Sequence, residues 1–326
     1  MGKKCIMLPM NAENRFEILR KRSEITEAVR NFFIDRGYLQ VSTPVLAPHV
    51  IPEAHIEIFR TELISPYEDP KNLYLLPSPE LWMKKLISEG SGSIFQICKS
   101  FRNYEQNGRN HSPEFTMLEW YTVEADYKHS LALTKELLAM LFSRFRPEYS
   151  TLPVNVISVR EAFLRTTGID IALCPDFGSI KSAALEKGYE IGADYTTWEE
   201  VFNKLFILET EPVVCGSGIT VLIDYPAQIP SLAKLNKENF TYERWEIYMD
   251  GIEIANCYSE ERRVDVVKDF YISEGNAKDE IAAVKVDVDY SYPEIFRTFP
   301  ECSGTALGMD RLVMILTGCR DIRNVL

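Results

Sequence analysis

The stretch from Phe95 to Tyr127 constrains the fold more than any other part of this chain. An apolar run ends at Arg102, and a second apolar run begins at Phe115. The polar loop between them contains Arg109 and His111. Two apolar runs on either side of such a loop are typical of a β-hairpin. Because this hairpin would gather two guanidinium groups, an imidazole and an aromatic ring, the residues predict a phosphate-binding site on an antiparallel sheet.

Three segments resemble the sequence motifs of class II aminoacyl-tRNA synthetases. Residues 101–121 (FRNYEQNGRNHSPEFTMLEWY) are similar to motif 2 in its lysyl form, and residues 304–316 (GTALGMDRLVMIL) are similar to motif 3. Residues 30–46 (RNFFIDRGYLQVSTPVL) resemble motif 1, a helix and then a strand with Pro44 near the dimer contact. The three occur in family order over nearly the whole chain. The resemblance implies an α+β fold, with a class II catalytic domain whose antiparallel β-sheet is flanked by helices, and a homodimer.

Length and composition fit one large domain, residues 1–326. The chain has 326 residues, of which 46% are hydrophobic and 26% charged, as is ordinary for a globular protein. No apolar run could cross a bilayer, and the N-terminus lacks the apolar core of a signal peptide, so we expect a cytoplasmic protein without membrane contact. The seven cysteines show no CxxC spacing and the four histidines are scattered, which disfavours zinc and disulfides. A net charge of −12 without a basic run disfavours tRNA as a partner.

Periodicity, capping signals and turn residues outline the elements. We expect helices at 13–36, from Pro79 onward, at 129–145 and at 259–278, and strands at 39–44, 219–225, 244–249 and 252–256. Asp250-Gly251 is a favoured two-residue hairpin connection between the last two strands. Residues 150–212 look helical and looped and resemble an insertion between motifs 2 and 3. Because the helix at 13–36 begins so early, we expect no anticodon-binding domain like the β-barrel of full lysyl-tRNA synthetases.

The resemblance implies that the hairpin and motif 3 hold ATP while a carboxylic acid is activated. The acid attacks the α-phosphorus and pyrophosphate leaves, a displacement that depends mainly on alignment and charge neutralisation. Arg102 would clamp the substrate carboxylate and the α-phosphate through its planar fork of donors. Phe115 and Arg311 would lie on the two faces of adenine, which makes Arg102 and Arg311 the catalytic pair. The remaining ATP contacts would be Glu105, Arg109, His111, Ser112, Glu253, Ile254 and Gly308.

Glu246 and Glu253 are the expected ligands of Mg²⁺. Both fall in the hairpin of residues 244–256, where we expect their carboxylates to face each other across the strands. Adjacent carboxylates are unfavourable unless a cation lies between them, and Mg²⁺ is commonly bound by one or two carboxylates plus phosphate oxygens. The resembling family has the pattern ExxxxxxExxNxxxE, which also implies that Asn256 holds the substrate carboxylate.

Glu260 is the residue that we expect to set amino-acid specificity. A buried lysine-like ammonium needs a carboxylate partner, because desolvation alone would make its binding costly. In lysine-specific members, the residues that match Glu260 and Tyr121 receive the side-chain ammonium, and Tyr258 would line the aliphatic stem. The segment that corresponds to the contact with the α- or β-amino group is Ser78-Pro79-Glu80.

One replacement in motif 3 distinguishes this chain from lysyl synthetases proper. Lysyl synthetases proper read GxGIGIDR, whereas here the second glycine is Ala306. Its methyl changes the shape of the pocket and not its charge, which favours a displaced amino group such as that of β-lysine. The chain therefore resembles the GenX/PoxA (EpmA) family, ligases that use ATP to attach (R)-β-lysine to a lysine of translation elongation factor P. The choice between α-lysine, (R)-β-lysine and another diamino acid stays open.

The motif 2 loop departs from the family pattern. It is one residue longer, and Tyr104 replaces the expected carboxylate, so we expect Glu105 to take the adenine-facing role through a register shift. Ser112 stands where the family has asparagine, which weakens one hydrogen bond to the nucleotide. Neither change removes an essential charge.

Three other functions remain as alternatives. A truncated lysyl-tRNA synthetase-like enzyme would charge tRNA from the same activation site, but no anticodon reader is visible. An amide ligase of the asparagine synthetase A type has a similar size, but it should not carry Glu260 opposite Tyr121. A non-catalytic regulatory paralogue would have no use for Arg102, Arg311 and paired magnesium carboxylates.

Overall fold

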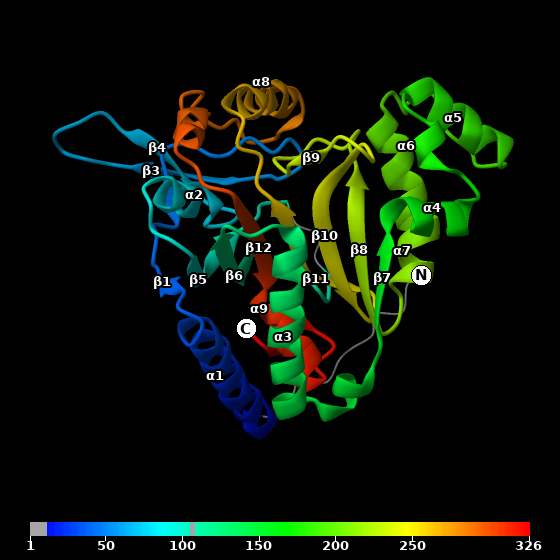
Figure 1. The fold of residues 1–326 in the computed structure, drawn as a ribbon. Helices are drawn as coiled ribbons and strands as arrows, with labels where there is room; N and C mark the ends of the chain where they lie inside the picture. The colour runs from blue at the N-terminus through cyan, green and yellow to red at the C-terminus, as the bar shows by residue number, and fades with distance from the viewer. Residues whose placement is uncertain (1–11, 105–107) are drawn as a thin grey trace, which may run out of the picture.

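The computed structural model describes residues 12–104 and 108–326, so the expectation for Glu105 lies outside the described residues. The strands of the central sheet are β1 (Leu39–Gln40), β5 (Ile94–Phe101), β6 (Glu114–Val123), β7 (Val154–Ser158), β8 (Ile219–Pro226), β9 (Leu235–Asn236), β10 (Thr241–Met249), β11 (Ile252–Ser259) and β12 (Cys302–Gly308). Their order is β1-β5-β6-β12-β11-β10-β8-β7, and β9 pairs with β10 (Figure 1). The α+β class is confirmed.

The central sheet is antiparallel from β5 to β8, as expected, but mixed at both edges. β5, β6, β12, β11, β10 and β8 pair antiparallel in succession. β1 joins β5 in parallel and β7 joins β8 in parallel. The expected strand at 39–44 is wrong in length, because β1 has only two residues. Pro44 has no amide donor, and the Thr43 amide donates to the Gln96 side chain instead of a strand, so the ladder ends early.

Both predicted hairpins are present in the structure. β5 and β6 pair from Ile94 opposite Tyr121 to Phe101 opposite Glu114, and the Arg102 amide donates to the Pro113 carbonyl at 3.0 Å beyond the last pair. Asp250 and Gly251 connect β10 to β11 with φ angles of +48° and +79°. A tight turn with positive φ at both central residues matches the twist of the two strands, and glycine adopts it without strain.

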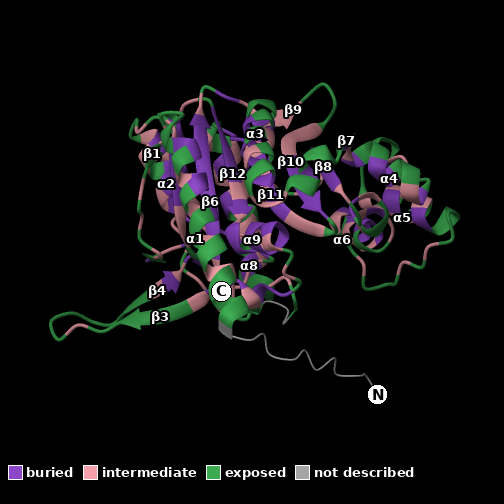
Figure 2. Ribbon diagram, turned by 90° about the horizontal axis from the view of Figure 1, so that it is seen from below, coloured by how far each residue is buried: buried purple, intermediate pink, exposed green. Residues whose placement is uncertain are grey.

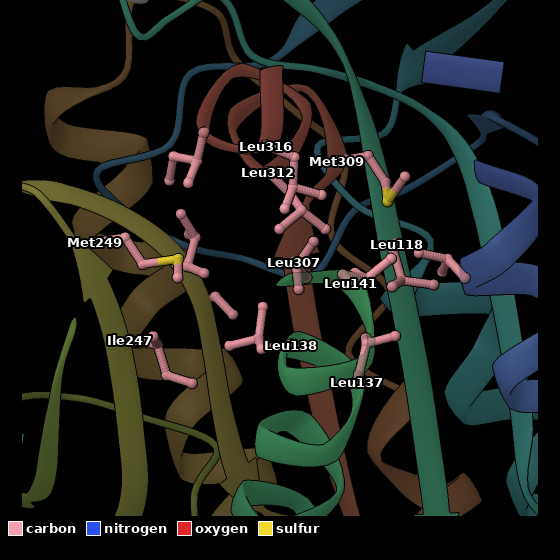
Figure 3. Packing of buried hydrophobic residues seen from close by; sticks show 14 of the residues in the cluster. Leu118, Leu137, Leu138, Leu141, Ile247, Met249, Leu307, Met309, Leu312 and Leu316 are labelled. Atoms are coloured by element: carbon pink, nitrogen blue, oxygen red, sulfur yellow. The ribbon is translucent and has the colours of Figure 1, made fainter. Parts of the chain in front are cut away.

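Three helices cover one face of the central sheet: α1 (Ala12–Ile34), α3 (Tyr127–Phe145) and α9 (Met309–Thr317). Figure 3 shows leucines of α3 and α9 packed with Leu118 of β6 and Leu307 of β12. The Asp126 side chain caps α3 by accepting the His129 amide proton at 2.8 Å. On α1 the apolar spacing buries Val29, whereas Phe16 near the start of the helix is 59% exposed.

The opposite face carries a second layer built from separate parts of the chain. Its elements are α2 (Glu80–Ser88), α8 (Val264–Ile281), the 3-10 helix η4 (Tyr292–Arg297) and a small sheet of β2 (Leu46–Ala47), β3 (Phe59–Leu63) and β4 (Lys71–Leu75). The β3–β4 hairpin projects from the body, and its tip is largely exposed (Figure 2). The helix expected at 259–278 begins only at Val264, since the Glu261 carboxylate accepts the amide protons of Arg262 and Arg263 and keeps that segment extended.

The insertion contributes a strand as well as helices. Residues 154–158 form β7, which extends the central sheet, whereas we expected only helices and loops over 150–212. β-Branched residues in this stretch suit a strand at a sheet edge. The helices of the insertion are α4 (Val159–Thr167), η2 (Ile171–Leu173), α5 (Phe177–Glu186), α6 (Trp198–Leu205), the π-helical turn η3 (Phe206–Thr210) and α7 (Glu211–Val214). They enclose their own core around Phe163 and Phe202, whose rings stack 5.0 Å apart.

Two short 3-10 helices complete the outline, η1 (Pro147–Thr151) after α3 and η5 (Ile322–Asn324) near the C-terminus. Within the described residues, no helix combines the length and the apolarity that a membrane span requires. The six described cysteines, all except Cys5, are free thiols, as expected.

Candidate active site

The candidate site lies on the face of the central sheet that α1, α3 and α9 leave open. Side chains alternate along a strand, so Glu119 and Tyr121 of β6 point away from Leu118 and Trp120, which belong to the core beneath the helices. Cross-strand partners share a face. The pairs that extend the site across three strands are Tyr121 with Gly304, Gly304 with Tyr258, Glu119 with Ala306, and Ala306 with Asn256.

Two adjoining cavities lie on this face. The first, of about 240 Å³, is lined by six glutamates and is named the acidic cavity below. The second, of about 200 Å³, contains Phe115 and Arg311 and is named the Phe115 cavity. The two are joined, because four residues line both: Arg102, Met117, Asn256 and Ala306. The six glutamates of the acidic cavity are Glu53, Glu80, Glu119, Glu199, Glu260 and Glu274.

The Phe115 cavity gathers most of the residues predicted to contact ATP. The β5–β6 hairpin places Phe115 at the start of β6, and Gly308 ends β12 where α9 begins, so that Arg311 falls in the first helical turn. The predicted residues that line this cavity are Arg102, His111, Ser112, Phe115, Glu253, Ile254, Gly308 and Arg311. A flat aromatic ring and a guanidinium in one small cavity suit a planar, electron-rich ligand.

Arg311 is held in a fixed position by backbone carbonyl groups. Its Nη1 donates to the carbonyl oxygen of Glu253 at 2.6 Å, and its Nε donates to that of Asn110 at 3.2 Å. The same guanidinium lies 3.7 Å from the Glu253 carboxylate. These contacts orient the plane of the guanidinium before any ligand arrives.

Arg102 lies where the two cavities meet. Its guanidinium carbon is 5.4 Å from the centroid of the Phe115 ring. Its Nε is buried and has no hydrogen-bond partner within the part of the chain that the structure describes. A buried donor left unsatisfied costs free energy, so an anionic group that reaches both cavities would be stabilised here.

Two predicted contacts are not part of either cavity lining. The Arg109 side chain is exposed, and its residue is tied to the protein through its carbonyl oxygen, which accepts the Ile322 amide proton at 2.8 Å. Pro79 is buried at the N-terminus of α2, whereas its neighbours Ser78 and Glu80 do line the acidic cavity.

The expected face-to-face arrangement of Glu246 and Glu253 is wrong. The two residues are not cross-strand partners, because Glu253 pairs with Tyr248 next to the turn, and Glu246 pairs with Asn256 beyond a bulge between Ile247 and Tyr248. Of the two carboxylates, only that of Glu253 lines the Phe115 cavity.

Both Glu246 oxygens already have partners in the protein. Arg244 donates to one oxygen at 2.6 Å, and the Tyr248 hydroxyl donates to the other at 2.8 Å. Burial, and then the charge of Glu246, raise the pKa of Glu253. Among residues 12–104 and 108–326, no three His, Cys, Asp or Glu side chains are grouped to hold a metal ion.

A buried cation that the motifs did not reveal lies behind the wall of the acidic cavity. Lys84 of α2 is fully buried, and its Nζ lies 2.5 Å from Glu80 Oε1 and 2.8 Å from Glu260 Oε2. It also donates to the Tyr258 hydroxyl at 3.2 Å, and that hydroxyl donates to Glu80. The spacing of Glu80 and Lys84 by four residues on a helix was the available signal.

Tyr121, which we expect to receive the substrate's side-chain ammonium together with Glu260, lines the same cavity as Glu260. Its hydroxyl donates to Glu119 Oε1 at 2.8 Å. Glu119 is 3% exposed, and its Oε2 has no hydrogen-bond partner among the described atoms. Burial raises the pKa of Glu119 well above its ordinary value, and the charge of Glu80 adds to the effect. Strand alternation could have revealed Glu119, because it shares a face with Tyr121.

Three further carboxylates line the acidic cavity from outside the motifs. Glu53 precedes β3, Glu199 lies in α6 of the insertion, and Glu274 lies in α8. Burial, helped by the charge of Glu80, raises the pKa of Glu53 to about 7. Burial likewise raises the pKa of Glu199, where His55 acts in the opposite direction. No local pattern in the sequence marks these residues, since only the tertiary fold brings them together.

Gly304 is required by the close approach of two cavity side chains. A Cβ atom at this position would lie 2.6 Å from Tyr121 Cε1 and 2.7 Å from Glu260 Oε1. The absence of a side chain at Gly304 therefore lets Tyr121 and Glu260 pack directly against strand β12. Ala306, two residues further along β12, places its methyl at the junction of the two cavities.

Comparisons with known proteins agree with this geometry. Residues 3–326 match the family model of tRNA synthetases class II (D, K and N). The chain is 33% identical over 316 residues to the elongation factor P–(R)-β-lysine ligase of Vibrio vulnificus strain YJ016, covering 95% of this chain and 94% of that one. It is 34% identical over 312 residues to the protein of the same name from Pectobacterium atrosepticum, covering 94% and 93%.

Proposed function

The chain belongs to the family of class II tRNA synthetases (D, K and N), and from that premise we propose that it is an elongation factor P–(R)-β-lysine ligase. As a member of this class it is an ATP-dependent ligase. The proposed reaction activates a lysine-type amino acid as its adenylate and transfers the acyl group to a lysine of translation elongation factor P. The observation that supports it best is the junction of the acidic cavity with the Phe115 cavity at Arg102.

Activation needs the amino-acid carboxylate and the α-phosphate of ATP in one place. A carboxylate oxygen forms a bond to the α-phosphorus while the bond to pyrophosphate breaks. Both reacting groups are anionic, so they repel each other until a cation lies between them. Arg102 is suited to this role, because its unpartnered Nε lies where an acid in one cavity meets a phosphate in the other.

In the Phe115 cavity, we propose that Phe115 and Arg311 hold the adenine ring. The predicted polar contacts around it are His111, Ser112, Glu253, Ile254 and Gly308, with Glu105 and Arg109 contributed by the motif 2 loop. Arg311 needs no rearrangement for this role, because backbone carbonyl groups already fix its guanidinium.

Only one of the two predicted Mg²⁺ ligands is free to bind the ion in this structure. Glu253 lines the Phe115 cavity and could bind the ion, whereas Glu246 is held by Arg244 and Tyr248. We propose that Glu253, Glu246 after release from Arg244, and the phosphate oxygens of ATP form the ligand set. Bound there, Mg²⁺ would neutralise part of the triphosphate charge.

The acidic cavity favours a substrate with more than one amino group. Glu80, Glu119 and Glu260 lie on its walls, and among the described atoms Glu119 and Glu260 each have a buried oxygen without a hydrogen-bond partner that can accept an ammonium proton. Asn256 and Arg102 are suited to the carboxylate at the junction, and Tyr258 to the aliphatic stem. The methyl of Ala306 beside the junction is our reason for preferring (R)-β-lysine to α-lysine.

In the second half-reaction, the acceptor amine attacks the acyl carbon of the adenylate. The new C–N bond forms, the C–O bond to AMP breaks, and the amine loses its proton. A translation factor as acceptor would place the reaction in the cytoplasm, as the sequence predicts. We also propose a homodimer through residues 30–46. A chain that sediments as a monomer at micromolar concentration would contradict that assembly.

One experiment tests the proposed activation directly. ATP–pyrophosphate exchange is measured with (R)-β-lysine, α-lysine and a panel of other amino acids. Exchange that depends on a lysine-type amino acid is expected, with (R)-β-lysine the better substrate. Exchange stimulated only by aspartate or asparagine would refute the assignment in favour of an amide ligase.

A further inference from the structure

Lys84 lies just outside the acidic cavity, and each of its ammonium protons has an oxygen atom nearby. Its ammonium has three protons and three oxygen neighbours: Glu80 Oε1, Glu260 Oε2 and the Tyr258 hydroxyl. It is fully buried and does not line the cavity. Lys84 therefore contacts the glutamates that the cavity presents to a substrate without being placed to contact the substrate itself.

Lys84 contacts only one of the two carboxylate oxygens of Glu260. Oε2 is ion-paired with Lys84 at 2.8 Å. Oε1 has neither an ion-pair partner nor a hydrogen-bond partner in the described structure, and Gly304, which lies beside it, also lines the acidic cavity. One oxygen thus fixes the carboxylate in the protein, and the other remains available to a ligand.

We propose that Lys84 is a positioning and specificity residue, which pins Glu260 so that its Oε1 receives the distal ammonium of a diamino acid. This inference rests on the proposed function and deepens it. It implies that Lys84, which does not line the cavity, helps to select an amino acid with two amino groups.

The balance of charge between Lys84 and three glutamates of the acidic cavity supports the proposal. Glu80, Glu119 and Glu260 supply three negative charges when ionised, and Lys84 supplies one positive charge, which leaves two negative charges. A substrate with two ammonium groups neutralises both. A monoamino acid leaves one buried carboxylate without a counter-charge, and such a carboxylate is costly to keep ionised.

The ionisation of Glu260 should depend on Lys84 and on the substrate. Burial raises the pKa of Glu260 to about 8, while Lys84 acts in the opposite direction. Without Lys84 the pKa would rise further, so a larger fraction of Glu260 would be protonated at any given pH, and an ammonium would have to displace that proton to bind. The charged and titratable groups that face Glu260 are Lys84 and Glu80 of α2, Glu119 and Tyr121 of β6, Cys257 and Tyr258 of β11, Cys302 of β12, and Tyr292 of η4.

The test compares Lys84→Met with Lys85→Met. Both substitutions remove a lysine charge from α2, but Lys85 is exposed and therefore serves as the matched control. At neutral pH, Lys84→Met should raise the KM for the lysine-type substrate in pyrophosphate exchange by about tenfold or more, with kcat changed by less than about threefold. The raised KM should fall only as the pH rises above about 8, because Glu260 without Lys84 ionises at a higher pH than it does in the parent. Lys85→Met should match the parent.

A double variant keeps the proposal testable if Lys84→Met does not fold. Lys84→Met combined with Glu260→Gln removes both charges of the buried pair, which proteins tolerate better than the loss of one. If Lys84 acts through Glu260, the KM of the double variant should lie within about threefold of that of Glu260→Gln alone. A further tenfold loss in the double variant would overturn the proposal, as would a Lys84→Met variant with the parent's KM and pH profile. Failure of the parent to exchange pyrophosphate with any diamino acid would instead refute the proposed function.

Discussion

The two cavities differ in how their charged groups are balanced before a ligand binds. In the Phe115 cavity, Arg311 is bonded to the carbonyl oxygens of Glu253 and Asn110, so its charge and orientation are already fixed. In the acidic cavity, Glu119 and Glu260 each keep a buried oxygen without a hydrogen-bond partner among the described atoms. Arg311 is therefore held in place by the protein before a ligand binds, whereas the carboxylates of the acidic cavity gain a partner only when a cationic ligand binds.

The difference has a physical consequence for recognition. A planar base gains from a ring and a fixed guanidinium, with little change in the ionisation of the protein. An ammonium in the acidic cavity instead meets carboxylates whose pKa values burial has raised, so its binding releases protons from the protein. The affinity for the amino acid should therefore depend on pH through Glu119 and Glu260.

Removing the residue that joins the cavities should have the largest effect. Arg102→Ala deletes the cation that both reacting anions would contact. We expect pyrophosphate exchange to fall by about three orders of magnitude, because a preorganised charge that acts on the transition state is lost. Lys99→Ala, at an exposed position of β5 just before Arg102, is the control and should leave exchange unchanged. Near-normal exchange in Arg102→Ala would contradict the shared role of this residue.

Glu260→Gln should weaken binding of the amino acid without weakening binding of ATP. The substitution keeps the size of the side chain but removes the charge that compensates the distal ammonium. Loss of a charge-assisted hydrogen bond costs about 1.5–3 kcal/mol, so the KM for a lysine-type substrate should rise by roughly ten- to a hundredfold. The KM for ATP should not change. Equal losses for ATP and the amino acid would show that the cavities are not independent in binding.

Ala306→Gly should alter the choice between α- and β-amino groups by a smaller amount. The methyl lies at the junction of the cavities, where it affects shape and leaves charge unchanged. We expect α-lysine to gain relative to (R)-β-lysine by about 1–3 kcal/mol in kcat/KM, the usual value of one methyl-sized contact. The choice of acceptor should stay the same. An unchanged ratio of the two substrates would remove Ala306 from the account of specificity.

The ligand-free protein should become less stable as the pH rises from about 5 to about 8. Glu53 and Glu260 have pKa values of about 7 and about 8 in the folded state, above the value of an exposed glutamate. The folded state therefore binds more protons than the unfolded state in this window, and its stability falls as these groups lose them. We expect the Tm to fall by roughly a few degrees in thermal scans. Glu260→Gln should flatten this slope, and a Tm that rises over the window would contradict the assignment.

The sequence predicted the Phe115 cavity far better than the acidic one. Phe115, Gly308 and Arg311 follow from local motifs, because a hairpin and a strand–helix junction fix their places within a few residues. Glu53, Glu199 and Glu274 come from three distant segments, so no local spacing connects them. Lys84 was detectable as the partner of Glu80 four residues earlier, but its contact with Glu260 depends on tertiary packing.

Sequence spacing also misplaced residues where backbone irregularities intervene. The prediction placed Glu246 opposite Glu253, but the tight turn at Asp250-Gly251 pairs Glu253 with Tyr248, and a bulge beyond this pair leaves Glu246 opposite Asn256. Likewise, a helix was expected from residue 259, where the capping interactions of Glu261 hold the chain extended until α8 begins. Such features arise from single side chains and from register, which composition and periodicity do not report.

The intact mass of elongation factor P tests the central claim most directly. The purified factor is incubated with this protein, ATP and (R)-β-lysine, and a tRNA pool is incubated in parallel as the competing acceptor. The account predicts that the factor gains the mass of one lysyl residue on a single lysine, that the gain requires ATP, and that tRNA charging stays weak. An unmodified factor together with efficient, tRNA-specific charging would contradict the account and identify a minimal lysyl-tRNA synthetase instead.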